Sequence, residues 1–273
     1  MLDFQSQFKA KKRIDFHGHP ISFVDVVPAV LKSSVPIFIA PGWGETPRTF
    51  KDLIHLLFDA GFRVISVTHP RQDLKLITRQ NISRLEFQKA EIILTVLKSL
   101  GISKVNAIAH SEGAINIVIA AHLHPSMFKD ILLAGPGGLV EGEGFLELVS
   151  RFIGNMIQGG MRAFIDPVAR MNLIMSGVET FRYFLMNPVM SLLEGSAISR
   201  MHLQGFLTEL HENNIRVGII HGTDDVVFPL KKMKNLIDMQ WIDFHSIPGD
   251  HSDIYAHPKD YISFFQERFS GIY

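Results

Sequence analysis

The chain of 273 residues is predicted to adopt an α/β fold, in which a doubly wound, mostly parallel sheet carries an inserted helical cap. Three observations predict this class. Short continuous runs of apolar residues recur along the chain, as strands covered on both faces require. Segments with helical periodicity alternate with these runs, which indicates right-handed crossovers between parallel strands. The alternation stops over residues 138–213, where helical segments follow one another without a credible strand.

The first part of the chain is predicted to form an antiparallel hairpin at one edge of the sheet. Residues 13–16 and 21–26 alternate or run apolar around His17-Gly18-His19-Pro20. Histidine is a common metal ligand, but no carboxylate or third histidine lies at ligand spacing from His17 and His19. We therefore interpret both as turn residues and predict no metal site.

The remaining strands and helices are predicted from apolar runs and from the residues that begin and end helices. Thr46-Pro47 is typical of a helix start, and Gly61 of its end. Ser83-Arg84-Leu85-Glu86 matches a capping box for the next helix, which ends at Gly101. Strands are predicted at 35–40, 63–68, 104–109, 130–134, 216–220 and 241–247, and further helices at 113–123, 231–239 and near 255–269.

The segment without strands is predicted to be a cap inserted into a single α/β domain. Residues 1–137 and 214–273 form the core of this prediction, and residues 138–213 form the cap, with seven of the eleven methionines. We expect most apolar side chains of the cap to pack against the main domain. The others are expected to border an apolar pocket, because methionine adapts its shape to irregular apolar ligands.

The composition excludes several classes of function. Lys plus Arg and Asp plus Glu number 27 each, so no net charge attracts nucleic acid or an anionic membrane. The chain has no cysteine, which excludes disulfides, thiolate zinc sites and a cysteine nucleophile and favours a reducing compartment. The first residues lack the order of a signal peptide, and no run of about eighteen apolar residues occurs. We predict a soluble, cytoplasmic protein without stable membrane insertion, and leave its oligomeric state open.

The stretch Ala109-His110-Ser111-Glu112-Gly113 carries the strongest functional signal. It joins an apolar strand to an apolar helix, so Ser111 lies on a sharp turn. Such a turn strains the backbone and brings together the residues two before and two after the serine, which must be small, as Ala109 and Gly113 are. Neighbouring side chains on one tight turn diverge. We therefore interpret His110 as a packed or solvated residue and not as a catalytic base.

This stretch resembles the nucleophile elbow of the α/β-hydrolase superfamily, G-x-S-x-G, with alanine in place of the first glycine. Two later stretches resemble the acid and histidine loops of the same superfamily. The first is His221-Gly222-Thr223-Asp224-Asp225, which is followed by an apolar pair and a proline. In the superfamily's acid loop the aspartate follows H-G-T-x, so the resemblance implies Asp225 as the acid, with Asp224 as the alternative. In Ile247-Pro248-Gly249-Asp250-His251, the implied base is His251. The chain order Ser, Asp, His is the order expected for that fold.

Other titratable residues near these loops are less suitable for the triad. Asp253 is too close in sequence to His251 to orient its ring, and His257 is interpreted as a surface or capping residue. If neither aspartate of the acid loop served as the acid, Glu141 or Glu143 would be the remaining candidates after the preceding strand.

The resemblance extends to a loop that would form an oxyanion hole. Ala40-Pro41-Gly42-Trp43-Gly44 follows the first strand of the parallel set and resembles the superfamily's H-G-x-x loop, with proline in place of histidine. Gly42 permits a close approach, and the resemblance implies the backbone amides of Trp43 and Glu112 as donors. The second amide begins a helix, where negative charge is favoured. One departure is His69-Pro70-Arg71-Gln72, because many members have an aspartate and glycines there.

The resemblance implies a serine hydrolase similar to carboxylesterases and lipases, with no metal or organic cofactor. Ser111 would attack an acyl carbon, and the substrate would be a small, largely apolar carboxylic ester. Amides, lactones, carbon–carbon bonds next to a ketone, and acyl transfer to an alcohol remain open. The alternative from another class is a small-molecule-binding protein that keeps the hydrolase scaffold but has little turnover.

Overall fold

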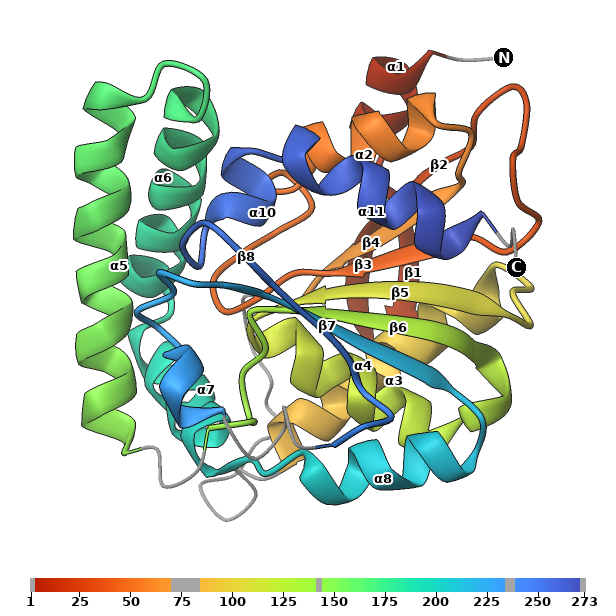
Figure 1. Ribbon diagram of the computed structural model, residues 1–273. Coiled ribbons are helices and arrows are strands. Elements are labelled where there is room, and N and C mark those ends of the chain that lie inside the picture. Colours follow the sequence, from red (N-terminus) through yellow and green to blue (C-terminus); the bar gives the residue numbers. More distant parts are fainter. Residues whose placement is uncertain (1–2, 70–83, 141–143, 234–238, 271–273) are drawn as a thin grey trace.

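The computed structural model describes residues 3–69, 84–140, 144–233 and 239–270. Its centre is an eight-stranded sheet with the strand order β1-β2-β4-β3-β5-β6-β7-β8. The pairs β1/β2 and β2/β4 are antiparallel, and the other neighbouring pairs are parallel, so the predicted fold class is confirmed (Figure 1). The strands are β1 (Lys12–Phe16), β2 (His19–Val26), β3 (Ile37–Ala40), β4 (Val64–Thr68), β5 (Val105–His110), β6 (Phe128–Ala134), β7 (Arg216–Gly222) and β8 (Asp243–Ile247).

Helices cover both faces of the sheet, as a doubly wound fold requires. Figure 1 shows one group of helices on one face of the sheet and a second group on the other. The first group is α1 (Phe4–Lys9), α2 (Lys51–Asp59), α10 (Asp253–Ala256) and α11 (Lys259–Phe269), and the second is α3 (Leu85–Ser99), α4 (Glu112–Leu123) and α8 (Gln204–Glu212).

The central strands are apolar throughout because both of their faces are covered. Every residue of β3 and β5 is buried. Successive side chains of a strand point to opposite faces, so Phe38 packs into the core under α3 and α4, whereas Ile37 and Ile39 pack into the core under α2 and α11. This packing fixes the position of the carboxyl end of β5 in the sheet, and Ser111 is the next residue along the chain.

The predicted edge hairpin is present, and its turn explains the local sequence. Lys12–Phe16 pairs antiparallel with the start of β2, and two residues connect the strands. His17 and Gly18 both have positive φ angles, 53° and 82°, as a type I′ turn requires. The histidines of this hairpin are therefore residues of a tight turn, as the sequence predicts.

The predicted helical segment lies between β6 and β7. It consists of α5 (Phe145–Ile165), α6 (Arg170–Met186), α7 (Pro188–Arg200) and α8. α5 and α6 form a helical hairpin at one end of the sheet (Figure 1), whereas α8 packs against α4 and β7 through Leu207 and Leu210. The division into a core of residues 1–137 and 214–273 and a cap of residues 138–213 stays a prediction.

Three local predictions differ from the structure. α2 begins at Lys51 and not at Thr46-Pro47, because the Thr46 and Thr49 hydroxyls accept hydrogen bonds from backbone amides in a preceding turn. The last helix is interrupted after Ala256, where Pro258 cannot donate a backbone hydrogen bond. Of the capping box, Ser83 lies outside the described residues, and the buried Glu86 accepts a hydrogen bond from Asn116 instead.

Most apolar side chains of α5 and α6 do not pack against the main domain, contrary to our expectation. Those that remain exposed include Ile153 and Phe164 on α5 and Ile174 and Phe181 on α6. None of the helices in the described part of the chain is both long and apolar enough to cross a bilayer.

Candidate active site

Ser111 occupies a strained turn between β5 and α4. Its φ and ψ angles are 55° and −121°, a conformation that costs a non-glycine residue free energy and is typical of a nucleophile elbow. A Cβ atom on Gly113 would lie 2.3 Å from the backbone oxygen of Ala40, and Ala109 is fully buried. Both neighbours of the turn must therefore be small, for the reason that the sequence suggests.

His251 and Asp225 form a buried pair. His251 Nδ1 lies 2.8 Å from Asp225 Oδ2, while Asp225 Oδ1 accepts hydrogen bonds from the amides of Val227 and Phe228 at 2.8 and 2.9 Å. Three hydrogen-bond contacts thus hold the carboxylate. This fixes the carboxylate against rotation and directs the other ring nitrogen, Nε2, away from it.

Electrostatics favour the charged forms of this pair. Burial opposes ionisation of Asp225, but the charge of His251 and its hydrogen bond hold the pKa of Asp225 below its ordinary value. Burial likewise opposes protonation of His251, and the charge of Asp225 outweighs it, so the pKa of His251 is raised above its ordinary value. Asp224, the alternative acid, is exposed to solvent and accepts a hydrogen bond only from Thr223 among the described residues.

Gly135 supports the pair and was not identified from the sequence. It has a φ angle of 48°, and a Cβ atom there would lie 3.0 Å from His251 Nδ1 and 3.1 Å from Asp225 Oδ2. Any side chain would push against both members. The signal in the sequence is only the Gly135-Pro136-Gly137-Gly138 run after β6, which does not point to a partner.

The loop after β3 lies against the nucleophile. A Cβ atom on Gly42 would come within 2.7 Å of Ser111 Cβ, so glycine is needed for this approach. Trp43 follows in the same turn and borders the cavity at Ser111, and Glu112 is the first residue of α4. The two amides predicted as oxyanion donors therefore belong to segments on either side of the serine.

His110 and Glu45 connect three of these segments. His110 Nδ1 lies 2.9 Å from Glu45 Oε2, and its Nε2 lies 2.9 Å from the backbone oxygen of His251. Glu45 Oε2 also accepts a hydrogen bond from the Gly42 amide at 2.6 Å. The packed histidine expected from the sequence thus ties the elbow to the oxyanion loop and to the histidine loop, and Glu45 is a site residue that the sequence analysis missed.

A buried group of charged residues lies behind the oxyanion loop. Lys89 of α3 forms ion pairs with Glu112 of α4 and, at 2.8 Å, with Glu194 of α7. Glu194 also accepts a hydrogen bond from the Tyr183 hydroxyl at 2.5 Å. Burial raises the pKa of the Glu112 carboxyl even though the charge of Lys89 opposes this effect. This cluster joins the residue after the nucleophile to two helices of the insertion.

α5 also contacts the histidine loop. Arg162 forms ion pairs with Asp250 and, at 2.7 Å, with Asp253, the residues on either side of His251-Ser252. Asn155 donates a hydrogen bond to the Ser252 hydroxyl at 3.2 Å. Asp253 therefore holds the loop through Arg162 and does not orient the His251 ring. His257, expected at the surface, bridges Asp253 and Asp166 at 3.0 and 2.9 Å.

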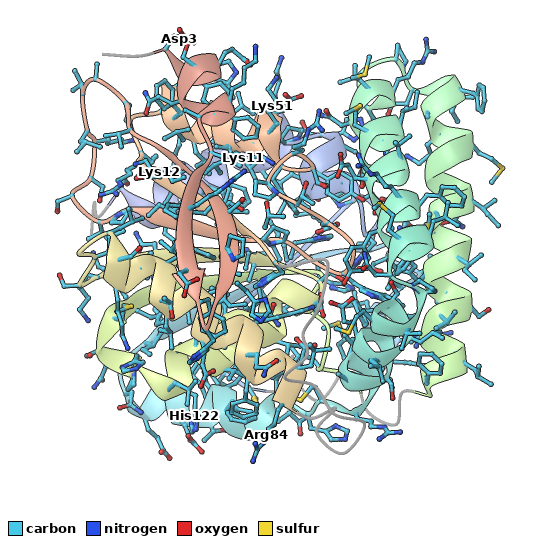
Figure 2. All side chains as sticks on the ribbon, turned by 180° about the vertical axis from the view of Figure 1, so that it is seen from behind. Asp3, Lys11, Lys12, Lys51, Arg84 and His122 are labelled. Atoms are coloured by element: carbon cyan, nitrogen blue, oxygen red, sulfur yellow. The ribbon has the colours of Figure 1, made fainter. Side chains whose placement is uncertain are left out.

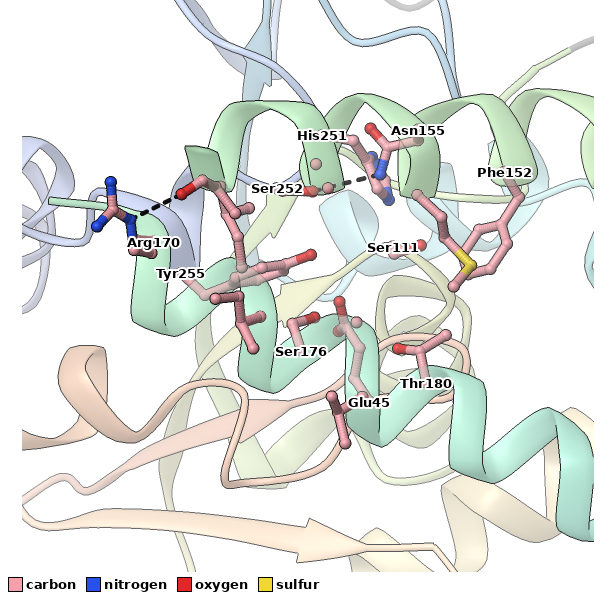
Figure 3. Close-up of a pocket in the computed structure, with 18 of the residues that line it drawn as sticks. Glu45, Ser111, Phe152, Asn155, Arg170, Ser176, Thr180, His251, Ser252 and Tyr255 are labelled. Carbon is pink, nitrogen blue, oxygen red and sulfur yellow. Dashed lines mark hydrogen bonds between the residues drawn. The ribbon is translucent and has the colours of Figure 1, made fainter. Parts of the chain in front are cut away.

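A cavity of about 580 Å³ lies between α5, α6 and the loops that carry these residues (Figure 3). Ser111 and His251 both border it, together with Trp43, Glu45 and side chains of both helices. Within the described residues no hydrogen bond joins Ser111 to His251. Contacts of this kind commonly tighten only when substrate binds. Most of the remaining lining is apolar, and its polar members are Asn155, Arg170, Ser176, Thr180 and Ser252.

Five residues named from the sequence cannot be placed. Glu141 and Glu143, the fallback acids, lie outside the described residues. Of the His69-Pro70-Arg71-Gln72 stretch, the structure describes only His69, whose ring is buried beside the Lys89 cluster; burial, together with the charge of Lys89, lowers the pKa of His69 well below its ordinary value.

No protein-family model matches the chain, and no curated protein matches it in sequence. Solved structures do match. A structure from work on carboxylesterases of the thaumarchaeon Nitrososphaera gargenis is 17% identical, with a TM-score of 0.68 over 95% of this chain and 98% of that one. An esterase from Exiguobacterium antarcticum is 15% identical, with a TM-score of 0.70 over 91% and 95%. An alpha/beta hydrolase enzyme from a Medee basin deep-sea metagenome library is 16% identical, with a TM-score of 0.68 over 96% and 98%. The chain therefore has the α/β-hydrolase fold.

Proposed function

We propose that this α/β-hydrolase-fold chain is a serine hydrolase that cleaves carboxylic esters through an acyl-enzyme intermediate. One observation carries the proposal: a serine on a strained elbow and a histidine paired with a buried aspartate border the same cavity. A serine hydroxyl is a poor nucleophile at neutral pH and needs a base that a third group orients. Esterases among the structural neighbours support the same reaction class.

In this mechanism Ser111 Oγ attacks the acyl carbon while His251 Nε2 accepts the hydroxyl proton. Asp225 keeps the proton of His251 on Nδ1 and stabilises the imidazolium that forms. The amides of Trp43 and Glu112 donate to the oxyanion of the tetrahedral intermediate. His251 then returns the proton to the leaving alcohol, and water, activated by the same base, releases the acid from Ser111.

The cavity supports an apolar substrate. Its walls consist mainly of aromatic, aliphatic and methionine side chains from α5 and α6, and Arg170 is the only lysine or arginine that borders it within the described residues. Such a pocket favours an uncharged acyl or leaving group of some length. Amides, lactones and acyl transfer to an alcohol use the same arrangement of groups, so a substrate panel must separate them.

A fluorophosphonate probe tests the proposal directly. Labelling of the native protein that is lost in Ser111→Ala is the expected result, since only an activated serine reacts under native conditions. Absence of labelling, with ligand binding retained, would instead assign the chain to the non-catalytic binding proteins on this scaffold. A panel of esters, lactones and amides then identifies the bond that is cleaved.

The length of the acyl chain is expected to control activity. For p-nitrophenyl esters from acetate to laurate, kcat/KM should rise until the cavity is full, because each buried methylene contributes up to about 0.8 kcal/mol, or roughly fourfold. A profile that is flat, or that falls from acetate onward, would mean that the cavity between α5 and α6 does not hold the acyl chain.

The activity is expected to fall at acidic pH. His251 must be neutral to accept a proton, and the charge of Asp225 raises the pKa of His251 above the ordinary value of 6.5 despite burial. The profile of kcat/KM against pH for an uncharged ester should therefore show its acid limb above pH 6.5, with activity present above that limb and lost below it. A limb well below this value would argue against the His251–Asp225 pair as the base.

A further inference from the structure

The helical hairpin of α5 and α6 exposes an unusual number of apolar side chains. Of the eighteen large apolar side chains that are exposed in the described residues, fifteen lie between residues 146 and 192. We call the central part of this set the outer face. It is defined by Ile153, Ile157 and Phe164 on α5 and by Ile174, Val178 and Phe181 on α6. Single exposed apolar residues are ordinary on a protein surface, but a contiguous group of this size marks a site of contact.

The spacing of these residues places them in stripes along each helix. On α6 the exposed apolar residues recur three or four positions apart, from Met171 to Leu185, and the same spacing relates Ile153, Ile157 and Phe164 with Met161 on α5. Residues three and four apart share one side of a helix. Figure 2 shows the side chains of α5 projecting away from the sheet into solvent.

The side of α6 that faces the protein is the more polar one. Its buried residues are Leu173, Ser176, Glu179, Thr180 and Tyr183, of which only the first is aliphatic. A surface helix of a protein in water normally has the opposite arrangement, with its apolar side turned inward. The outer side of α6 is therefore suited to contact with an apolar partner or an apolar phase.

The outer face is continuous with the cavity at Ser111. Phe164, Ile174 and Val178 belong to the outer face and also border the cavity. Between the helices the cavity is walled by glycines, and a Cβ atom on Gly160 or Gly177 would meet no heavy atom within 4 Å. Because these glycines have no side chains, open space remains at this wall of the cavity, next to the outer-face residues that border it, and we call this space the slot.

The exposed charges of the three helices α5, α6 and α7 are mainly positive, and Arg170 and Arg182 lie on α6 itself. The charged side chains of α5, α6 and α7 that are exposed are Glu147, Arg170, Arg182 and Arg200. Arginines at the border of an apolar helix face suit phosphate headgroups, as in helices that lie in a membrane interface. Two copies of this chain that met through the same face would bring their arginines together and would also cover the slot.

We propose that the outer face docks on a lipid surface and that the substrate, a long-chain ester held in that surface, enters the cavity through the slot between α5 and α6. The two helices would lie flat in the interface, since neither is suited to span a bilayer. The identity of the entering molecule as an ester rests on the proposed function, whereas docking itself does not require catalysis.

Vesicle flotation of the full chain tests docking separately from turnover. The Ser111→Ala variant is mixed with vesicles of phosphatidylcholine, with and without phosphatidylglycerol, and is expected to float with both, and better with the anionic lipid. Adding Ile157→Glu or Phe181→Glu should lower the partition to vesicles by about tenfold or more, because each change places a charge in the buried interface. Both side chains are more than half exposed, at 59% and 58%, so the variants should fold.

Val30→Glu is the matched control. Val30 is 80% exposed but lies in the loop between β2 and β3, on the far side of the molecule from α5. If docking uses the outer face, Val30→Glu in the Ser111→Ala protein should float as well as Ser111→Ala alone, which is the parent protein here. Failure of the parent to float, or equal loss in the control, overturns the proposal. So does a dimer in sedimentation velocity that Ile157→Glu dissociates, because the face would then bind a second copy.

The slot is tested by Gly177→Leu, which fills open space on a helix that tolerates leucine better than glycine. The expected result is a fall in the ratio of laurate to acetate kcat/KM, with vesicle flotation unchanged. An unchanged ratio would show that substrate does not pass between the helices.

Flotation and fluorophosphonate labelling separate the two proposals. If flotation succeeds while labelling fails, the proposed function is wrong and docking stands. If labelling succeeds while flotation fails, the proposed function stands and docking is wrong.

Discussion

Replacing Ser111 or His251 by alanine is expected to lower kcat by about a million-fold, because nucleophile and base act as one unit. The measurement is kcat on the preferred p-nitrophenyl ester for both single variants and for the double variant. The double variant should be no slower than either single one. If it were far slower, one of the two residues would act outside the proposed unit.

The two variants should differ in stability, which provides an internal control. Both side chains are nearly buried, at 6% exposure of each residue, so neither lies in the open loops where active-site residues are often found. Ser111→Ala removes one hydroxyl and should leave the Tm almost unchanged. His251→Ala leaves Asp225 Oδ2 without its partner in a buried site, which costs about 1–3 kcal/mol and should lower the Tm measurably while the fold persists.

Asp225→Asn is expected to cost up to about four orders of magnitude in kcat, since an amide in place of the carboxylate favours the wrong tautomer of the histidine. Asp224→Asn is the matched variant one residue away, and it should cost little because that side chain is exposed and does not contact His251. Measuring kcat for both variants on the same ester compares the two assignments. Equal losses would leave the acid unassigned, and the reverse order would transfer the role to Asp224.

Much of the fold and the central residues of the site are predictable from local patterns. The central strands of the sheet are continuous apolar runs, and each predicted triad residue follows a predicted strand. Ser111, Asp225 and His251 also lie within short motifs whose residue types follow from the turn or the chemistry. The parts that failed depend on contacts between distant segments. α2 begins late because of hydroxyls in the turn before it, which the pattern Thr46-Pro47 does not reveal.

The buried charges were the least predictable part of the site. Lys89 and Glu86 lie on a helix whose sequence suggests a solvated polar side, because lysine and glutamate are rarely buried without partners. The two carboxylates that pair with Lys89 belong to Glu112 and Glu194, which follow it by more than twenty and more than a hundred residues, and the hydrogen-bond donor to Glu86 is Asn116. The exposed apolar side of α6 was misjudged for a related reason. A stripe of apolar residues indicates which side of a helix is apolar, but it does not indicate whether the main domain covers that side.

The ion pairs of Arg162 and Lys89 have a consequence for how far the insertion can move. They tie its first and third helices to the histidine loop and to α3, so a rigid swing of the whole insertion would separate both. Breaking the buried Lys89–Glu194 pair alone would cost about 3–5 kcal/mol, which would limit the fully open population to roughly one molecule in a few hundred or fewer. We therefore expect the insertion to move little as a unit. Exchange of substrate and product would then depend on side-chain rotations along the proposed slot, which are many orders of magnitude faster than domain motions.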